Sequence, residues 1–167
     1  MLNLIGTSKQ LEKTLFDEQD NVMMDTNLLS NNEVDYFHFD FHANCRENSD
    51  AMMDFLRSAV LPTHLERMGV FIMYNNIVDE RSPDGNVKTR KLVTELERMQ
   101  NGVIRTNCID CLDRTNVAQQ MICLETLSHL VPEMGSQEDW TESFIYLWAM
   151  AGDFISQEYS GTPSVLT

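Results

Sequence analysis

The sequence predicts an α/β fold, in which a mixed and partly parallel sheet is flanked by helices, and three observations lead to this prediction. Segments with strand-like and helix-like patterns alternate along the chain of 167 residues, as they do in α/β proteins. Hydrophobic residues make up 43% of the chain, which is enough to bury one ordinary core. In addition, a short apolar segment, a loop bounded by a cysteine and an arginine, and a helix-compatible run follow one another.

The N-terminal part is predicted to contain two strands and a helix. Residues 2–5 are mostly apolar and predict a short buried strand. Residues 8–24 carry apolar side chains at helical spacing and predict a helix. Residues 27–32 are rich in asparagine and predict a loop. Residues 34–42 alternate between aromatic and polar side chains, as a strand with one buried face does.

The middle of the chain is predicted to continue this alternation. A helix over residues 50–60 should end before Pro62, because a residue that precedes a proline disfavours the helical conformation. Residues 69–74 are predicted to form a strand. The polar segment 81–88 contains a proline and a glycine that suit a turn. Residues 93–99 are predicted to be helical.

The C-terminal part is predicted to hold a strand, a loop and two helices. Residues 103–105 predict the strand that enters the loop, and residues 115–130 predict the helix that leaves it. A long helix over residues 138–158 is expected to be interrupted or to end near Gly152, because glycine disfavours a helix interior.

The loop between the predicted strand and helix has the composition of a phosphate site. Cys108 and Arg114 are separated by five residues, and Thr115 follows directly. Such a loop can turn its backbone N–H groups toward one point at the positive end of the following helix, which makes an anion site. We therefore expect the pKa of Cys108 to be lowered from about 8.5 toward neutrality. Arg114 can hold two phosphoryl oxygens in a bidentate fork, so these residues predict a metal-free phosphatase with a phosphocysteine intermediate.

Three segments carry a resemblance to a known family. Residues 105–116 run Arg-Thr-Asn-Cys-Ile-Asp-Cys-Leu-Asp-Arg-Thr-Asn, residues 37–42 run Phe-His-Phe-Asp-Phe-His, and residues 148–162 contain Trp-Ala, Gly-Asp and Tyr-x-Gly-Thr. The first segment resembles the signature of the Sac-domain phosphoinositide phosphatases and fills every fixed position of it. The other two resemble the family's accompanying elements. The resemblance implies a cysteine-phosphatase P-loop, and it implies that residues 1–167 form a single partial catalytic domain that lacks the usual N-terminal half.

The resemblance also implies an activity. We expect hydrolysis of an inositol-ring phosphate ester, with phosphatidylinositol 4-phosphate as the substrate and 3-phosphate or 3,5-bisphosphate lipids as alternatives. No cofactor and no metal are expected, and the enzyme should be cytoplasmic, acting peripherally on cytosolic faces of endomembranes. Two other interpretations remain open. One is a catalytically silent phosphoinositide-binding or scaffold fragment, and the other is a cysteine-dependent protein phosphatase.

The loop residues divide into catalytic and substrate-binding candidates. Cys108 is the expected nucleophile, and Arg114 is expected to stabilise the transition state. Thr115 can donate its hydroxyl to the sulfur, cap the following helix, or do both. Asp110 is the expected general acid, with Asp113 as its alternative. The candidate substrate-binding residues are Asn107, Ile109, Cys111, Leu112 and Asp113 in the loop, and Lys88, Arg90 and Lys91 upstream of it.

Two of these groups have competing interpretations. Lys88, Arg90 and Lys91 form the densest basic cluster, which is either a positive rim for a phosphorylated head group or an ordinary solvated surface. Cys111 forms Cys-x-x-Cys with Cys108. It is therefore considered for a zinc site, a redox dithiol, a reversible disulfide with an oxidised Cys108, and simple loop packing.

Composition argues against several other classes of protein. The net charge of −14 argues against DNA or RNA as a partner and against strong unaided adsorption to an anionic membrane. The sequence contains no apolar run of about 18 residues, so no transmembrane helix is predicted. The four cysteines are too few for a disulfide framework. His38, Asp40 and His42 are predicted to share one face of a strand, where a polar network behind the loop is favoured over a metal site.

Overall fold

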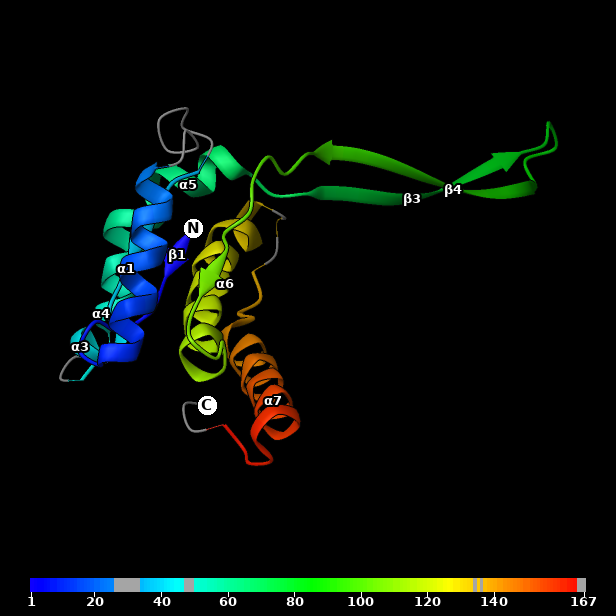
Figure 1. Cartoon of the computed structure of the whole chain (residues 1–167). Helices are drawn as coiled ribbons and strands as arrows, with labels where there is room; N and C mark the ends of the chain where they lie inside the picture. Colours follow the sequence, from blue (N-terminus) through cyan, green and yellow to red (C-terminus); the bar gives the residue numbers. More distant parts are fainter. Residues whose placement is uncertain (26–33, 47–49, 134, 136, 165–167) are drawn as a thin grey trace. The chain divides into compact units, whose positions relative to one another are not determined.

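The computed structural model describes residues 1–25, 34–46, 50–133, 135 and 137–164. The chain divides into two compact units, one made of residues 1–62 and 104–167 and the other of residues 63–103 (Figure 1). Each unit is described by itself. The loop predicted over residues 27–32 lies outside the described residues.

A small parallel sheet lies at the centre of the first unit. Strand β1 (Leu2–Asn3) pairs in parallel with β2 (Phe37–His38) on one side and with β5 (Thr106–Asn107) on the other. Backbone hydrogen bonds extend the pairing beyond the strands, since the N–H of Leu4 donates to the carbonyl of Asn107 at 2.8 Å. The predicted α/β class with a parallel sheet and helices is confirmed, although the strands are shorter than predicted.

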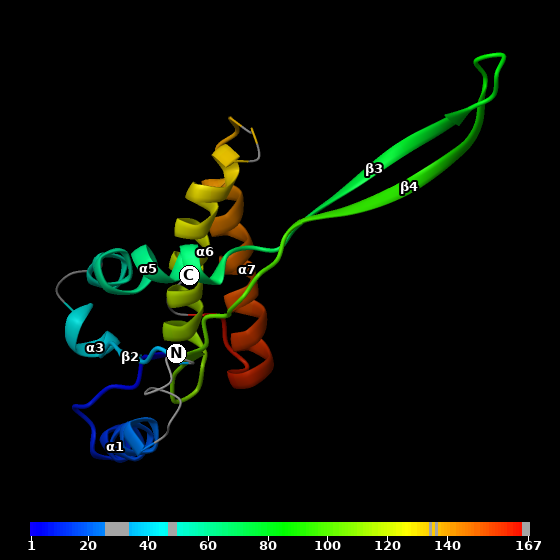
Figure 2. The ribbon, with the colours of Figure 1, turned by 90° about the horizontal axis from the view of Figure 1, so that it is seen from above.

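Three long helices belong to the same unit as the sheet. Helix α1 (Gln10–Asp25) follows β1, and α6 (Asp113–Glu133) follows β5. These two helices lie on different sides of β1 (Figures 1 and 2), and α7 (Thr141–Ser160) runs beside α6. The buried apolar side chains of the unit are Leu2, Leu4, Ile5, Met23, Phe39, Met52, Leu56, Val60, Leu61 and Ala118. The core therefore lies between the sheet and the helices that follow its strands.

Helix α7 exposes much of its apolar surface. It is not interrupted at Gly152, contrary to the prediction, because Gly152 is buried within the helix and the chain turns only at Gly161, whose φ is 75°. Its exposed large apolar side chains are Ile145, Tyr146, Leu147, Met150, Phe154, Ile155 and Tyr159. In the described part of the chain, no helix is both long and apolar enough to cross a membrane.

The strand predicted over residues 34–42 is mostly irregular and helical instead. Only β2 is extended, and Asp40 caps the short helix α3 (Phe41–Asn44) by accepting a hydrogen bond from the N–H of Ala43 at 3.0 Å. A helix-capping side chain explains the difference, because aspartate at such a position satisfies an N–H that the helix leaves unpaired. As a result, His42 does not share a strand face with His38 and Asp40.

The helix predicted over residues 50–60 continues past the proline that was expected to stop it. Helix α4 (Ala51–Phe55) passes into the π-helix η1 (Leu56–Val60) and then into α5 (Leu61–Met68). In this π-turn the N–H of Leu61 donates to the carbonyl of Leu56. Pro62 lies in the first turn of α5, where a missing N–H removes no bond of that helix, so the switch in hydrogen-bond pattern accommodates the proline.

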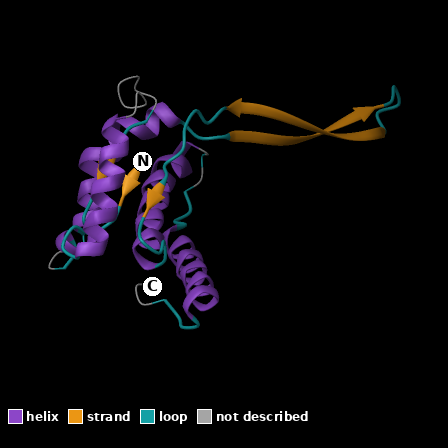
Figure 3. Cartoon of the chain, viewed as in Figure 1, coloured by secondary structure: helices purple, strands orange, loops and turns teal. Residues whose placement is uncertain are grey.

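The second unit is built on an antiparallel hairpin. Strands β3 (Ile72–Arg81) and β4 (Val87–Arg98) are the longest strands described (Figure 3). The predicted turn between them is confirmed and has Gly85 at a φ of 87°. The predicted helix over residues 93–99 is wrong, because β4 contains β-branched residues that favour strands and aligns Leu92 opposite Ile77 across the hairpin.

Candidate active site

The candidate site lies at the carboxyl edge of the parallel sheet. The strand order is β2-β1-β5. The chain passes from β1 through α1 to β2 on one side, whereas β5 pairs on the other side of β1 and continues into α6, so the carboxyl ends of β1 and β5 form a topological switch point. Ligands of open α/β sheets bind outside the carboxyl ends of strands at such a point. Two segments meet there: residues 4–7, which leave β1, and residues 108–112, which leave β5.

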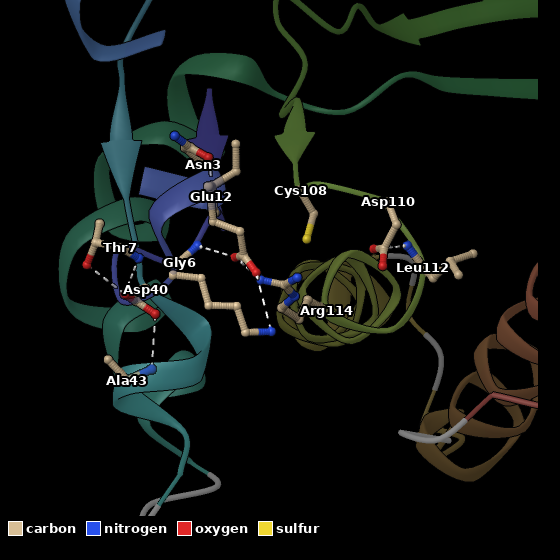
Figure 4. Close-up of polar contacts among 12 residues, drawn as sticks. Asn3, Gly6, Thr7, Glu12, Asp40, Ala43, Cys108, Asp110, Leu112 and Arg114 are labelled. Atoms are coloured by element: carbon tan, nitrogen blue, oxygen red, sulfur yellow. Dashed lines mark hydrogen bonds and ion pairs between the residues drawn. The ribbon is translucent and has the colours of Figure 1, made fainter. Parts of the chain in front are cut away.

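The loop 108–112 curls around its first residue. Backbone N–H groups of Ile109 and Asp110 hydrogen-bond to the sulfur of Cys108. The N–H of Leu112 donates to Oδ1 of Asp110 at 3.2 Å (Figure 4), and Cys111 has a positive φ of 57°. The thiol of Cys111 donates to the carbonyl of Cys108 at 3.5 Å. The N–H groups of Ile109 and Asp110 thus act on the sulfur of Cys108, and a complete phosphate-binding P-loop stays a prediction.

Arg114 belongs to the first turn of α6 and is paired with a carboxylate from another helix. Its Nη1 donates to Oε2 of Glu12, in α1, at 3.1 Å (Figure 4). The exposed fractions of the two side chains are 11% for Arg114 and 7% for Glu12. The same Oε2 atom accepts the backbone N–H of Gly6 at 3.0 Å. Glu12 thus links the segment after β1 to the arginine after β5.

The pKa of Cys108 is raised, not lowered as the sequence predicted. Burial of the thiol is the main cause, and the negative charge of Asp110 adds to it. The guanidinium of Arg114 and the N–H groups of Ile109 and Asp110 lower the pKa but do not outweigh burial.

Thr115 is the third residue of α6 and does not cap it. The helix begins at Asp113, so the predicted capping role is wrong. The Thr115 side chain is buried, and its Oγ1 atom has no hydrogen-bond partner among the described residues. A buried hydroxyl without a partner is unfavourable. Thr115 Oγ1 therefore makes no hydrogen bond to the sulfur of Cys108 in this structure, and that second predicted role stays a prediction.

Asp113 contacts the C-terminal segment of the chain. Its Oδ1 atom accepts the hydroxyl of Ser164 at 2.8 Å, and the N–H of Ser164 donates to Oδ1 of Asp153 in α7 at 3.0 Å. Asn116, in α6, donates to the carbonyl of Trp148 in α7 at 3.1 Å. These contacts join the start of α6 to α7 and the C-terminal segment, so Asp113 has a structural role in the described chain.

Comparison with known proteins decides the family. The chain is 35% identical over 150 residues to the phosphoinositide phosphatase SAC6 of Arabidopsis thaliana, covering 82% of this chain and 22% of the relative. It is 33% identical over 148 residues to the phosphatidylinositol-3-phosphatase SAC1 of Saccharomyces cerevisiae, covering 83% of this chain and 22% of the relative. The chain belongs to the Sac-domain phosphoinositide phosphatase family. A shorter match to synaptojanin-1 of Homo sapiens has 41% identity over 75 residues, covering 41% of this chain and 5% of the relative.

This Sac-domain chain spans only 22% of the length of SAC6 and of yeast SAC1. No family model matches the chain, and no solved structure matches it.

The remaining predicted loop residues differ in their exposure. Ile109 and Cys111 are exposed, and Leu112 is half-buried. The side chain of Asn107 accepts a hydrogen bond from Nε of Arg105 at 3.0 Å and donates to the sulfur of Met1 at 3.2 Å. Asn107 is therefore held beside the N-terminus of the Sac-domain chain.

The predicted basic cluster lies on the hairpin, in the second unit. Arg90 donates to Asp79 at 3.0 Å, and Lys91 pairs with Glu80. Arg90 lies directly opposite Asp79 in the β3–β4 register, whereas Lys91 lies opposite Val78 and reaches Glu80 diagonally. The basic side chains remain largely exposed. Lys88 is exposed at the start of β4. Lys88, Arg90 and Lys91 all belong to β4, where neighbouring side chains alternate between the two faces, and the rim they were predicted to form at the loop stays a prediction.

A polar network supports the segment that leaves β1. Nε2 of His38 lies 2.9 Å from the carbonyl of Ile5, and the His38 ring packs against Phe16. Oδ2 of Asp40 accepts hydrogen bonds from the N–H and the hydroxyl of Thr7 at 2.8 and 2.9 Å. Among the described residues, no three His, Cys, Asp or Glu side chains are grouped so as to hold a metal ion. His38 and Asp40 thus hold residues 5–7 in place, and within this segment the N–H of Gly6 donates to the Glu12 carboxylate.

Glu12 is the site residue that sequence reasoning missed. The apolar residues of α1 predicted that the side of the helix with Leu11 would be buried. In the structure Leu11 is 71% exposed, whereas Glu12 is buried. Nothing in the local sequence marks it, because its partners Gly6 and Arg114 become neighbours only through the parallel sheet.

We expect the stability of the chain to fall in acid because of Glu12 and Asp40. Burial raises both pKa values, but Arg114 and Gly6 outweigh it for Glu12, and Thr7 and Ala43 outweigh it for Asp40. The folded-state pKa values are therefore below the ordinary values of 4.5 and 3.8. The stabilisation is fully present above pH 4.5 and is lost as the pH falls through the folded-state values, at about 1.4 kcal/mol per pKa unit of depression.

Urea unfolding followed by circular dichroism at several pH values between 7 and 3 measures this dependence. Glu12→Gln and Asp40→Asn should each have a flatter dependence than the wild type, because the titrating group is gone. If the free energy of unfolding of the wild type and both variants falls in parallel below pH 4.5, other groups are responsible.

Proposed function

We propose that this Sac-domain chain carries the catalytic loop of a phosphoinositide phosphatase that hydrolyses phosphatidylinositol 4-phosphate through a phosphocysteine intermediate. The observation that carries the proposal is the placement of Cys108. Its sulfur accepts two backbone N–H groups and lies within the field of Arg114, at the carboxyl edge of the sheet. Backbone donors and a guanidinium beside one nucleophilic atom form a site for a phosphoryl group.

In the first step, the sulfur of Cys108 attacks phosphorus in line with the bond to the inositol oxygen. A sulfur–phosphorus bond forms as that phosphorus–oxygen bond breaks. Asp110 is the proposed general acid, and it donates a proton to the leaving inositol oxygen. Its position supports this role, because its side chain is exposed beside Cys108 and is oriented by the N–H of Leu112, whereas Asp113 contacts Ser164.

In the second step, water attacks phosphorus and the sulfur leaves. Asp110, now ionised, takes a proton from the water as general base. Arg114 stabilises the equatorial oxygens in both transition states. Thr115 donates its unpaired hydroxyl to the departing thiolate, which is consistent with its buried Oγ1. Inorganic phosphate is released, and the starting protonation of Asp110 is restored.

The raised pKa of Cys108 adds one requirement to the first step. The thiol is protonated at neutral pH in the free chain, so its proton must leave before attack. A bound phosphate ester dianion can accept that proton on one of its oxygens. The substrate then arrives as a dianion and reacts as a monoanion beside a thiolate. After the second step the departing thiolate takes this proton back from the product phosphate, which restores the thiol.

Substrate access is proposed to occur at a membrane surface, on cytosolic faces of endomembranes. The supporting observations are the lipid substrates in the names of the relatives and the exposed loop residues Ile109 and Cys111. Lys88, Arg90 and Lys91 are proposed to attract the phosphorylated head group. Raising the salt concentration should weaken this attraction, because screening reduces interactions between exposed charges.

The test is phosphate release from a panel of phosphoinositides in mixed vesicles, with EDTA present throughout. We expect the full chain to release phosphate most rapidly from phosphatidylinositol 4-phosphate. A phosphotyrosine peptide and a phosphoserine peptide serve as the comparison substrates. Faster turnover of either peptide than of every lipid would select a cysteine-dependent protein phosphatase. Saturable binding to the lipid vesicles without any turnover would select a binding module.

A further inference from the structure

The ion pair between Glu12 and Arg114 has no part in the steps proposed above. Both side chains are buried, with exposed fractions of 7% and 11%. Removing two charges from water is unfavourable, so a buried pair is weak evidence of a contribution to stability alone. A buried partner of the arginine expected to bind phosphate points instead to a role in the reaction.

The carboxylate of Glu12 is held in one place from several directions. Oε2 accepts the N–H of Gly6 at 3.0 Å as well as Nη1 of Arg114 at 3.1 Å. Lys9 lies 3.8 Å from Oε1 at the exposed side of the pair. A Cβ atom at Gly6 would lie 2.9 Å from Oε2 of Glu12, which is too close. Glycine at this position therefore allows the carboxylate to rest directly against the backbone after β1.

Arg114 has donors left over after this contact. A guanidinium carries five N–H donors, and only Nη1 is hydrogen-bonded to another described residue. Figure 4 shows that Glu12 reaches the guanidinium from α1, whereas the sulfur of Cys108 lies on the loop that follows β5. One end of the fork is thus anchored, and the other donors remain for a phosphoryl group.

We propose that Glu12 is a positioning residue, which holds the guanidinium of Arg114 so that its remaining N–H donors meet a phosphoryl group attached to, or attacked by, Cys108. This inference rests on the proposed function. An arginine side chain has many rotamers, and fixing one of them before the substrate binds removes that entropy cost from the reaction. Misplacement of a binding group by about 1 Å can slow an enzyme about 100-fold.

The same contact would have the opposite effect if Glu12 competed with phosphate for Arg114. Removal of the carboxylate would then free the arginine and speed the reaction. Two features favour positioning. The carboxylate is buried and held by Gly6, so it is not free to leave, and it engages a single nitrogen of the guanidinium.

Steady-state kinetics of Glu12 variants in the full chain distinguish the two effects. Glu12→Ala should lower kcat for phosphatidylinositol 4-phosphate by about 10- to 100-fold, with a smaller change in KM. Glu12→Gln keeps an oxygen acceptor for Arg114 and should lose no more than about 5-fold by comparison. Glu125→Gln is the matched control, because it alters another arginine–glutamate pair at 2.9 Å, with Arg57, away from the loop. A kcat for Glu12→Ala equal to or above that of the wild type overturns the proposal.

The pH dependence of Cys108 alkylation tests the same proposal without any lipid. Iodoacetamide rates are measured in a chain in which Cys45, Cys111 and Cys123 are serine. In Glu12→Ala the released guanidinium should move away, so the thiol pKa should rise and alkylation at pH 8 should slow. In Glu12→Gln the guanidinium stays while a negative charge is lost, so the pKa should stay or fall. A lower pKa in both variants would show that Arg114 needs no anchor and would overturn the proposal.

Gly6→Ala provides a variant that keeps both charges. Its Cβ should displace the Glu12 carboxylate, so the same slower alkylation and lower kcat are expected. Circular dichroism checks that each variant is folded. If Glu12→Ala does not fold, comparison of the two single variants Gly6→Ala and Glu12→Gln decides the proposal. A wild-type alkylation rate and a wild-type kcat in Gly6→Ala would contradict the positioning role of Glu12. If the wild type hydrolyses no lipid, the proposed function fails, and the alkylation series still decides the role of Glu12.

Discussion

Replacing Cys108 with serine is expected to reduce phosphate release from phosphatidylinositol 4-phosphate by at least about 10⁴-fold, as removal of a nucleophile does in other enzymes. A serine hydroxyl is a much weaker nucleophile than a thiolate, and Asp110 is proposed to be protonated in the first step and so cannot activate it as a base. The change is nearly isosteric, and Cys108 is only half-buried, so the fold should persist. Vesicle binding should also persist, because the backbone N–H groups and Arg114 are unchanged.

Cys111→Ser is the matched control for this experiment. Cys111 is exposed, and its thiol contacts only the carbonyl of Cys108 in the described chain, so a serine hydroxyl can replace it. We expect release within about 3-fold of the wild type, in line with a surface substitution. Loss of release in Cys111→Ser as well would favour a dithiol mechanism. Undiminished release in Cys108→Ser would contradict the phosphocysteine proposal outright.

The sequence predicted the loop and its neighbours because their signals are local. Cysteine, arginine and threonine at fixed spacing, between an apolar segment and a helical run, are sufficient to indicate a strand, a loop and a helix. The structure shows β5, the loop 108–112 and α6 in that order, although β5 is Thr106–Asn107 and the residues predicted as the strand, 103–105, are irregular. Helical spacing likewise located α1 and α7, although it did not identify the face of α1 that is buried.

Long-range contacts were beyond the reach of these local patterns. Glu12 and Arg114 are separated by 102 positions, and only parallel pairing of β1 with β5 brings them together. The raised pKa of Cys108 has the same origin, because its main cause is burial of the thiol by the folded chain. A motif specifies which groups are present, whereas packing decides how strongly each one acts.

Competition between local preferences explains the other differences. In residues 34–42 the aromatic alternation favours a strand, but the side chain of Asp40 caps a helix and also holds Thr7, so the strand ends early. In residues 93–99 the helical pattern is weaker than pairing with β3, which aligns Val93 with Asn76 and Leu96 with Met73. Cross-strand partners of this kind are visible only once the hairpin is known.

Arg114→Lys is the second change expected to have a very large effect, a loss of about 10²- to 10³-fold in kcat/KM. Lysine keeps the positive charge but presents a single ammonium in place of a planar fork. It can pair with Glu12 or with the phosphoryl group, and its shorter reach does not satisfy both. Arg114→Ala is less informative, because it leaves Glu12 buried without its partner at a cost of about 3 kcal/mol and confounds activity with unfolding.

Parallel measurements separate the roles of charge and geometry at Arg114. Arg57→Lys changes the exposed partner of Glu125 and should leave kcat/KM within about 2-fold, as surface ion pairs contribute little. The pKa of Cys108, from alkylation rates, should change less in Arg114→Lys than in Arg114→Ala, because the charge is retained. A variant with normal thiol pKa and reduced kcat/KM would assign the loss to the missing fork. Wild-type kcat/KM in Arg114→Lys would mean that charge alone stabilises the transition state, and the anchored fork would then have no catalytic role.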